Sequence, residues 1–396
     1  MSSSSQPYWA LSSVYFFYFA SLGILMPYLG LYLQSLGYVA AQIGLVFASI
    51  QGTKIIAPNI WAWISGGRQE IIKMVRLAAL LSVVFFSFML MNNTLMTIII
   101  ISFLFSFFWN ALLSQFEVVT LNLLGDETES YGKIRLWGSI GFILAVAGGG
   151  WVLDFIGLKH WPVITLVILS LVVLASMFVR GDQRVNTSKA EGSMLSLLKN
   201  KQTIAFFIIL FLIQASHGPY YSFFSISLNE IGFTETEVGL LWSLGVIAEI
   251  VLFMLMQRIL NYLSLRNVLL ISILLTIVRW LIMGWFLNNM TMLIIAQTLH
   301  AVSFGAFHLV GIQFVHKHFT GDNQVKGQAL YSSIGFGVGG MCGSLIAGYF
   351  WALIGHEWVF TIAAGLSVLA LYVAWQWVHF HHFTNKIIID VGRSQE

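Results

Sequence analysis

The chain alternates between long apolar stretches and short polar turns. Most stretches reach about 20 residues, the length that an α-helix needs to cross the hydrocarbon core of a bilayer. The turns contain glycine, asparagine or charged residues, as at Gly37, Asn92-Asn93 and Asn288-Asn289. The pattern predicts an all-α membrane protein with twelve transmembrane helices, at 8–34, 41–65, 71–91, 95–124, 132–155, 160–180, 202–229, 236–260, 266–286, 290–318, 323–352 and 357–380.

The amino-acid composition excludes several classes of protein. Hydrophobic residues make up 58% of the 396 residues and charged residues only 9%, whereas roughly 25% of a typical soluble protein is charged. These values exclude a soluble enzyme, a disordered chain and a nucleic-acid-binding protein. With Cys342 as the single cysteine, an internal disulfide and a cysteine-rich metal site are excluded too. Residues 1–7 hold no Lys or Arg, so we expect the first apolar stretch to be a retained helix and not a signal peptide.

The positions of the basic residues predict an orientation. If both termini are cytoplasmic, Lys159 is alone in the outer loops, and Lys54 and Arg279 fall inside the hydrocarbon. The remaining basic residues all fall at inner loops or span ends, as the positive-inside rule requires. They are Arg68, Lys73, Arg76, Lys133, Arg135, Arg180, Arg184, Lys189, Lys199, Lys201, Arg258, Arg266, Lys317, Lys326, Lys386 and Arg393.

An internal repeat divides the chain. The segment 32–45, YLQSLGYVAAQIGL, matches 227–240, SLNEIGFTETEVGL, and 136–142 matches 330–336 at nearly the same offset. Such matches indicate duplicated halves, so we predict pseudo-symmetric six-helix bundles at 1–180 and 201–396, joined by a basic linker at 181–200. Parallel repeats of this kind are typical of transporters that bind substrate between the halves. The glycine-rich fifth and eleventh spans indicate tight helix packing, rocking between states, or both.

Ionisable groups at membrane depth are candidates for function because they are costly to bury. The spans contain Lys54, Glu117, Arg135, His217, Glu249, Arg279, His300 and His308. Several share a helix face with aromatic residues: His217 with Tyr221, Glu249 with Trp242, and His300 with Phe304. Lys54 and Glu249 occupy equivalent positions of the repeat, 195 residues apart, and are candidates to face each other across a central cavity.

Structural roles are the alternatives for these groups. Lys54 is also compatible with snorkelling to the interface. Glu249 with Arg279, and Glu117 with Arg135, are also compatible with static ion pairs. His308 is as compatible with a hydrogen-bonded core position as with a cavity wall. No set of His, Asp and Glu has convincing metal-ligand spacing, so neither a metal nor a cofactor is expected.

Several motifs resemble the lactose permease branch of the major facilitator superfamily. They are YGKIRLWGSIGF at 131–142 with Glu117 upstream, Glu249, VRWLIMG around Arg279, and TLH ending at His300. HGPYYSF at 217–223, VGLLWSLGVIAEIVLF at 238–253 and Lys54 resemble the bacterial 3-phenylpropionate permease subgroup more closely. The resemblance extends over essentially the whole chain and implies the major facilitator fold.

The resemblance also implies roles for matching residues. Glu117 and Arg135 would bind substrate, Glu249 would link binding to protonation, and Arg279 and His300 would belong to the coupling network. Two positions depart from the family pattern. Ser303 replaces the proton-carrying carboxylate, and Phe142 replaces the tryptophan that stacks on a sugar ring.

These observations together predict a proton-coupled transporter that imports a small organic solute by alternating access. An aromatic carboxylate such as 3-phenylpropionate fits best, because an anion needs a cation in a low-dielectric cavity and a phenyl ring needs aromatic walls. The predicted substrate-binding residues are Lys54, Glu117, Arg135, Phe142, His217, Tyr221, Trp242 and Phe304. The predicted proton-coupling residues are Glu249, Glu117, Arg279 and His300.

The alternatives are an oligosaccharide or nucleoside proton symporter and a drug/proton efflux carrier. An enzyme is not expected, because the sequence lacks a nucleophile elbow and an HExxH motif. We expect a multi-pass protein of the bacterial inner membrane that works as a monomer, with a small solute and a proton as its partners.

Overall fold

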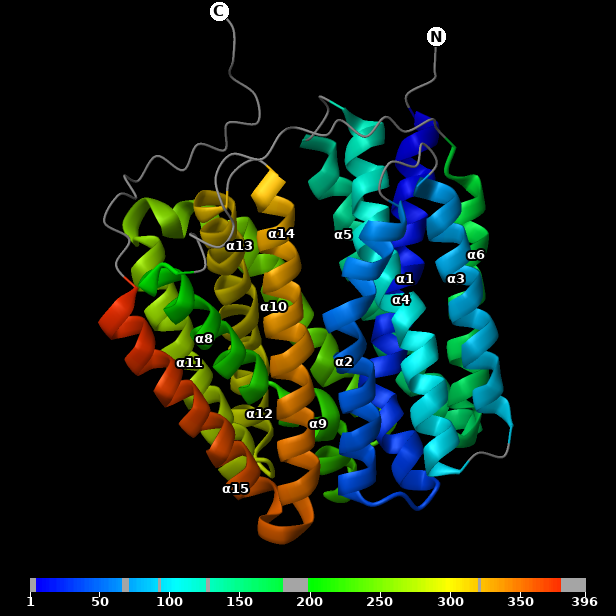
Figure 1. Cartoon of the computed structure of the whole chain (residues 1–396). Helices are drawn as coiled ribbons and strands as arrows, with labels where there is room; N and C mark the ends of the chain where they lie inside the picture. The colour runs from blue at the N-terminus through cyan, green and yellow to red at the C-terminus, as the bar shows by residue number, and fades with distance from the viewer. Residues whose placement is uncertain are drawn as a thin grey trace, which may run out of the picture.

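The structure of the protein is a computed structural model that describes residues 5–65, 71–91, 94–125, 129–180, 199–319 and 322–378. The first bundle of helices precedes residue 181 (Figure 1) and comprises α1 Ser5–Ser35, α2 Ala40–Ser65, α3 Ile71–Ser87, η1 Phe88–Leu90, α4 Leu95–Leu124, α5 Glu129–Ile156, η2 Leu158–His160 and α6 Trp161–Phe178. The second comprises α8 Lys201–Ser216, α9 Gly218–Glu230, α10 Glu235–Tyr262, α11 Leu265–Trp285, α12 Met290–Thr298, η3 Ala301–Ala306, α13 Phe307–His318, α14 Asp322–Tyr331, η4 Ser332–Gly339 and α15 Gly340–Trp377. We call them the N-terminal and C-terminal bundles. Most of the predicted linker, residues 181–198, lies outside the described residues.

The described chain crosses the molecule twelve times. Eleven of its helices are long and apolar enough to span a membrane, and the last of these, Lys326–Trp377, has 52 residues. Gly355 inside this helix has a φ of 82°, a left-handed conformation that glycine adopts readily. It marks the turn between two antiparallel runs at the bottom of Figure 1. The predicted fold class is therefore confirmed.

The repeat is visible in the turns between helices. Gly37 follows α1 with a φ of 86°, and its repeat partner Gly232 follows α9 with a φ of 97°. Both positions need the left-handed region that glycine adopts without strain. Thr234 then begins α10 with a capping box, in which its side chain and that of Glu237 each accept a backbone N–H of the other residue. Equivalent residues therefore make equivalent turns.

Three predicted spans of the C-terminal bundle are interrupted in mid-span. The span at 202–229 is broken at His217, where α8 ends and α9 begins; Pro219 in the first turn of α9 has no N–H to continue the ladder. The span at 290–318 contains the π-helical segment η3, and the span at 323–352 contains the π-helical segment η4. Such segments are rare and are found frequently at functional sites. All three irregularities lie in the C-terminal bundle.

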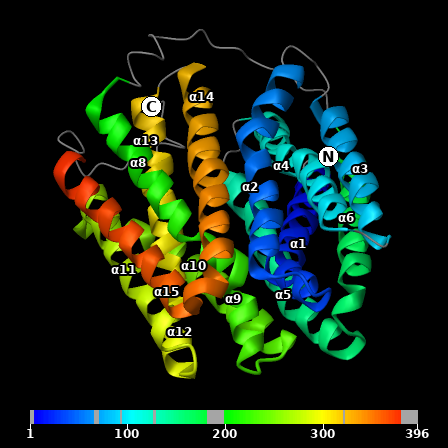
Figure 2. The same cartoon turned by 60° about the horizontal axis from the view of Figure 1, so that its bottom comes forward.

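The hydrophobic cores show where the bundles meet. We call the end at which α1 begins the terminal end and the opposite one the far end. The main core includes Tyr28 and Trp161 of the N-terminal bundle together with Phe223, Trp242 and Trp351 of the other bundle. Separate clusters, around Phe206 in the C-terminal bundle and Trp61 in the N-terminal bundle, lie toward the terminal end. The bundles therefore share apolar packing toward the far end, and Figures 1 and 2 show them side by side.

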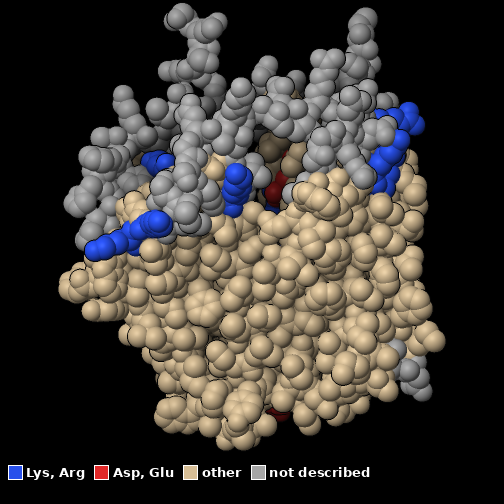
Figure 3. Space-filling model, viewed as in Figure 1, with Lys and Arg blue, Asp and Glu red and all other residues tan. Residues whose placement is uncertain are grey.

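Charged side chains mark the terminal end. Figure 3 shows Lys and Arg at the rim that carries the termini, above a broad belt without charges on the visible face. The large apolar side chains exposed to the outside include Trp63, Trp151, Phe155, Met254 and Tyr262. Such a belt is suited to contact lipid.

Candidate functional site

The far end between the bundles is closed by direct contact of helix backbones. A Cβ added to Gly44 of α2 would lie 2.8 Å from the Cα of Gly348 in α15. A Cβ on Gly239 of α10 would overlap the carbonyl oxygen of Val146 in α5, and one on Gly150 would overlap that of Glu235. Small residues at both crossings therefore allow α2–α15 and α5–α10 to touch.

Polar contacts reinforce the crossing of α5 and α10. The carboxylate of Asp154, near the end of α5, accepts the backbone N–H of Glu235 at 2.8 Å and that of Thr236 at 3.0 Å. It also accepts the Thr236 hydroxyl. Asp154 thus caps the start of α10, where unpaired N–H groups and the helix dipole favour a negative charge. The Tyr28 hydroxyl lies beside this contact, 2.6 Å from Val146 O and 3.2 Å from Glu235 O.

The bundles separate toward the terminal end. Figure 3 shows a hollow there between them, with acidic side-chain atoms visible inside it. Lys54, Glu117, Arg135 and Glu249 are all half-buried, and each belongs to a membrane-spanning helix, Arg135 to its first turns. Ionisable groups at this depth normally face a wet cavity or the interior of a bundle.

Interactions across the gap define this space. The Lys54 Nζ lies 5.8 Å from the centroid of the Phe336 ring in η4. Arg135 of α5 acts electrostatically on Glu249 of α10 and on His308 of α13. We call the space that Lys54, Arg135, Glu249, His308 and Phe336 enclose the central cavity. The first two come from the N-terminal bundle and the other three from the C-terminal bundle.

Lys54 and Glu249, the candidates to face each other across the cavity, each lie against the opposite bundle but at different helices. Among the described residues, neither makes an ion pair within 4.0 Å, and the charged group that acts on Glu249 is Arg135. The reason is the pairing of the helices: α2 packs against η4 and α15, whereas α10 packs against α5. Lys54 therefore lies over Phe336, and Glu249 lies opposite Arg135.

Aromatic rings surround Arg135 on the N-terminal wall. Its guanidinium carbon lies 3.9 Å from the centroid of the Phe19 ring and 5.7 Å from that of Tyr15. Glu117 interacts with the hydroxyl of Tyr131 and, electrostatically, with Arg135. Within the described part of the chain these two form no ion pair closer than 4.0 Å, so the static bridge considered from the sequence is not formed.

Arg279 lies inside the C-terminal bundle and not in the cavity. It is 0% exposed, and it donates from Nε to the carbonyl oxygen of Ala296 at 3.0 Å and from Nη1 to Ser303 Oγ at 3.1 Å. Its guanidinium carbon also lies over the rings of Tyr220 and Trp280, at 4.3 and 4.6 Å. The ion pair with Glu249 considered from the sequence is therefore absent among these contacts.

The predicted histidines and aromatic residues form a continuous stack. The Phe304 ring lies 5.3 Å from His300 and 6.0 Å from His308, nearly parallel to both. His217 lies 6.1 Å from both Phe304 and Tyr221. The π-helical segment η3 carries Phe304, which explains how three rings of one span can align. His308 ends this stack beside the cavity, with its Nδ1 3.0 Å from the Tyr331 hydroxyl.

The other predicted wall residues lie at the edge of this stack or apart from it. Trp242 lies 6.2 Å from Tyr221 and donates from Nε1 to Ser225 Oγ at 3.0 Å. Phe142 is buried in the main core, where its backbone touches Gly23. Substrate contact by these two residues stays a prediction.

Five residues at or beside the cavity were not among the predicted site residues: Phe19, Tyr131, His308, Tyr331 and Phe336; for His308 the sequence left a core position and a cavity wall open. Signals for some of them are in the sequence. Tyr131 begins the YGKIRLWGSIGF motif, and Phe336 is the repeat partner of Phe142. Phe19 carries no motif, and only the packing of α1 against α5 brings it to Arg135.

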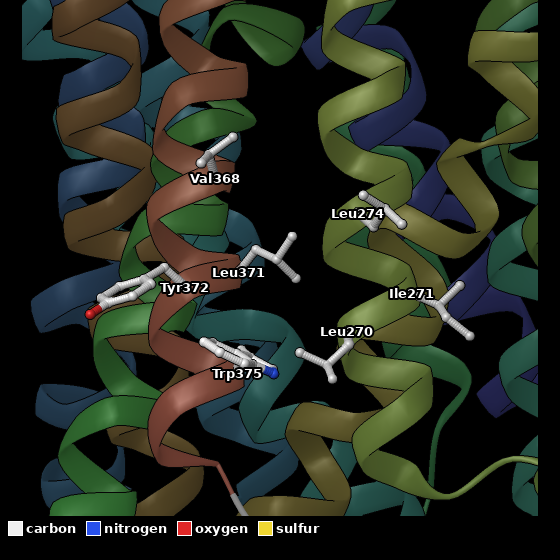
Figure 4. Close-up of a pocket in the computed structure, with 7 residues that line it drawn as sticks. All are labelled: Leu270, Ile271, Leu274, Val368, Leu371, Tyr372 and Trp375. Atoms are coloured by element: carbon white, nitrogen blue, oxygen red, sulfur yellow. The ribbon is translucent and has the colours of Figure 1, made fainter.

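A groove on the outer surface of the C-terminal bundle is separate from the cavity. It lies between α11 and α15 (Figure 4) and is lined by Leu270, Ile271, Leu274, Val368, Leu371, Tyr372 and Trp375. Its walls are almost entirely apolar. They hold no group that could bind a charged solute, so the candidate site is the central cavity.

Comparison with known proteins agrees with this architecture. The model of the MFS_1 like family matches residues 8–362. The chain belongs to this family, within the major facilitator superfamily. Similar proteins include a probable 3-phenylpropionic acid transporter of Escherichia coli (strain K12), 29% identical, with 91% of this chain and 95% of that protein aligned. The maltose permease of Geobacillus stearothermophilus is 23% identical, with 90% and 92% aligned.

A solved structure has the same fold. The crystal structure of the nucleoside transporter NupG superimposes with a TM-score of 0.80 at 19% identity, covering 92% of this chain and 97% of that one. These relatives and neighbours are transporters and not enzymes. This major facilitator protein is therefore a multi-pass membrane transporter of a small-molecule substrate.

Proposed function

We propose that this transporter imports a small aromatic carboxylate, of which 3-phenylpropionate is the model compound, together with a proton. The observation that carries the proposal is the pair of cations in the central cavity. Lys54 and Arg135 are half-buried, neither has a described acidic group within 4.0 Å, and each lies over a phenylalanine ring. A carboxylate would supply the missing negative charge, since unpaired cations in a low-dielectric site are costly.

The walls of the cavity suit an aromatic ring. Phe336 lies beside Lys54 and Phe19 beside Arg135, and the Phe304 ring lies 6.2 Å from that of Phe336. Aromatic pairs gain about 0.5–1.5 kcal/mol beyond the burial of their area. A solute with a phenyl group one or two carbons from a carboxylate would engage both kinds of wall at once. The related E. coli protein is named a probable 3-phenylpropionic acid transporter, which supports the same class.

Glu249 is our choice for the proton carrier. It lies in the cavity opposite Arg135. Among the described residues, Arg135 of the other bundle is the charged group that affects the Glu249 carboxylate. Rocking of the bundles would change that distance and thereby the affinity of Glu249 for a proton. Glu117 and His300 are the further candidates, and Arg279 would act on the network from behind Ser303.

The orientation completes the proposal. Basic side chains gather at the terminal end, and by the positive-inside rule that end faces the cytoplasm of a bacterial inner membrane. The far-end contacts then correspond to a closed outer gate and the hollow to an inward-open cavity. One chain contains both walls of the site, which fits function as a monomer.

Uptake by proteoliposomes tests the substrate class. Radiolabelled 3-phenylpropionate is supplied outside at a lower pH than inside, with unlabelled 3-phenylpropanol, uridine and maltose as competitors. The alcohol keeps the ring without the charge, and the other two compounds represent the nucleoside and oligosaccharide alternatives. We expect uptake that is blocked by excess unlabelled acid and by none of the three competitors. Competition by uridine or maltose would contradict the proposal.

Lys54→Gln and Arg135→Gln test the cations. Each should raise KM for the acid severalfold or abolish uptake, whereas Lys159→Gln, which removes an exposed charge at the far end, should leave uptake unchanged. Transport by all three variants at the unsubstituted rate would overturn the assignment. Uptake into inverted vesicles with an acidic interior would instead favour the efflux carrier, because the cytoplasmic face of the membrane is outside in such vesicles.

A further inference from the structure

Arg279 carries a buried charge without a carboxylate beside it. Its side chain is 0% exposed, and no acidic oxygen of a described residue lies within 4.0 Å of it. Tyr220 and Tyr221 are the titratable groups beside it, and the Tyr220 hydroxyl lies near enough to interact with the guanidinium, but both residues are neutral. Ring faces and a backbone carbonyl stabilise a guanidinium partly, but they do not neutralise it. Buried charges in proteins are normally paired.

Polar atoms without partners gather around this guanidinium. Arg279 Nη2, Gln297 Nε2 and His300 Nδ1 are fully buried and make no hydrogen bond. Tyr220 connects the three residues, because its ring lies 4.3 Å from the guanidinium carbon and 5.6 Å from the His300 ring, and its hydroxyl donates to Gln297 Oε1 at 3.2 Å. Unsatisfied buried polar atoms are rare in native proteins and require an explanation.

A fourth unpartnered atom, His217 Nε2, lies on the other side of the cluster. The His217 ring is 4.8 Å from Trp280, and both Arg279 and His300 interact with His217 electrostatically. His217 Nδ1 lies 2.8 Å from the carbonyl oxygen of Ile213. Nδ1 therefore carries a hydrogen, and Nε2 of the neutral ring is an acceptor without a partner.

We propose that the cluster around Arg279 is a binding site for a monovalent anion. Arg279 Nη2, Gln297 Nε2 and His300 Nδ1 would donate to it, and Arg279 would supply the positive charge. Water would satisfy the donors but would leave the charge uncompensated in a region of low dielectric. An anion does both. The site lies inside the C-terminal bundle, behind the wall of the central cavity, and it does not depend on the function proposed above.

Two sources of the anion share this chemistry. The complete burial of Arg279 and His217 favours an ion of the size of chloride, whereas the carboxylate group of the transported acid is the other source. On the proposed route the anion would pass His300, which is 6% exposed and stacks on Phe304 at 5.3 Å. Either anion would enter there.

Ser303 offers an internal substitute for the anion. Its Oγ accepts from Arg279 Nη1 at 3.1 Å, so Ser303→Asp places a carboxylate within reach of the guanidinium. Ser303→Asn has nearly the same size and no charge, and it serves as the matched control. A merely structural role of Arg279 would make these two variants behave alike.

The test is thermal unfolding of the purified full-length protein in detergent. Sodium gluconate is replaced by sodium chloride at constant ionic strength, and a parallel series adds 3-phenylpropionate to gluconate buffer. We expect a saturable rise in the unfolding midpoint, on the order of a few degrees, for the unsubstituted protein and for Ser303→Asn. Ser303→Asp should unfold at the higher temperature in gluconate and should not respond to the anion.

The pattern of responses identifies the source. A response to chloride assigns the site to an inorganic anion; a response to 3-phenylpropionate alone, lost in Ser303→Asp, assigns it to the substrate carboxylate. No response to either anion, or an equal response in Ser303→Asp, would overturn the site. If Ser303→Asp does not fold, crystals grown in bromide decide: an anomalous peak beside Arg279 Nη2 supports the site, and its absence refutes it. Failure of phenylpropionate uptake bears only on the proposed function, because the chloride series contains no substrate.

Discussion

Arg135 of α5 is the charged group that acts on Glu249 of α10, although the two residues belong to different bundles. Their helices touch at the far end, where Gly239 meets Val146, and separate toward the terminal end. The interaction therefore reports on the opening of the cavity. A movement that closes the terminal end would bring the carboxylate and the guanidinium closer together.

Glu249→Gln should uncouple transport from the pH gradient. A gradient of 1 pH unit corresponds to about 1.4 kcal/mol and can sustain about tenfold accumulation of an acid that moves with one proton. The variant cannot carry that proton, so we expect internal and external concentrations to become equal while exchange of labelled for unlabelled substrate continues. Accumulation and exchange are both measured in proteoliposomes. Glu357→Gln at the far end is the control, and accumulation by Glu249→Gln would exclude Glu249 as the carrier.

Asp154→Ala should open the far end. The substitution removes the cap of α10 that comes from the other bundle, and the loss of a helix cap costs about 1 kcal/mol, or about fivefold in the balance between conformations. Electron paramagnetic resonance on spin labels at Val39 and Ile231, with Cys342 replaced by serine, measures the separation of the two bundles there. We expect a larger population of long distances, and Asp154→Asn should lie between. An unchanged distribution would mean that the cap does not hold this end.

Gly150→Val should also open the far end, because the added side chain would disturb the packing of α5 against α10. Its side chain would collide with the carbonyl oxygen of Glu235, whereas a Cβ on Gly148, two residues earlier in α5, meets no atom within 4 Å. Gly148→Val is therefore the matched control on the same helix. The first variant should populate the long distance between the labels and lower the transport rate, and the second should do neither. Equal behaviour of the two would refute the role of this close approach.

Phe336→Leu should weaken binding of the aromatic solute. If the ring contributes about 1 kcal/mol of aromatic contact, KM for 3-phenylpropionate rises about fivefold. The saturated analogue 3-cyclohexylpropionate lacks the aromatic term, so its inhibition of uptake should change less. Phe155→Leu, which replaces an exposed ring on the lipid-facing surface, should change neither value. An equal loss of affinity for both acids would show that Phe336 contributes packing and no specific aromatic contact.

Much of the fold follows from the sequence because its signals are local. Span length, the charges of the loops and glycine turns such as Gly37 and Gly232 depend on residues close together in the chain. The break at His217 and the π-helical segments η3 and η4 were not predicted. The break has a local signal in Pro219, which a hydropathy pattern does not register. The two π-helical segments have no such signal in the hydropathy pattern.

The sequence indicated several of the residues that lie at the cavity but not their arrangement, and their role in transport stays a prediction. Lys54, Arg135, Glu249 and Phe304 do lie at or beside one cavity, since polar groups at membrane depth have few other places to go. The repeat suggested Lys54 opposite Glu249, but repeat-related positions need not face each other. Which helices face each other is set by the close approaches at Gly44 and Gly239, and these determine that Glu249 lies opposite Arg135.

The shared core has a consequence for the energetics of alternation. Apolar side chains from both bundles pack together toward the far end, around Tyr28 and Trp351, while the clusters around Phe206 and Trp61 remain separate. A change to the conformation that is closed at the terminal end must therefore expose the apolar surface shared at the far end and bury another at the terminal end. The equilibrium between the two conformations of the substrate-free protein should then depend on the difference in apolar area that each of them buries. Because hydrophobic stabilisation depends on temperature, this equilibrium should shift with temperature even where no charge changes.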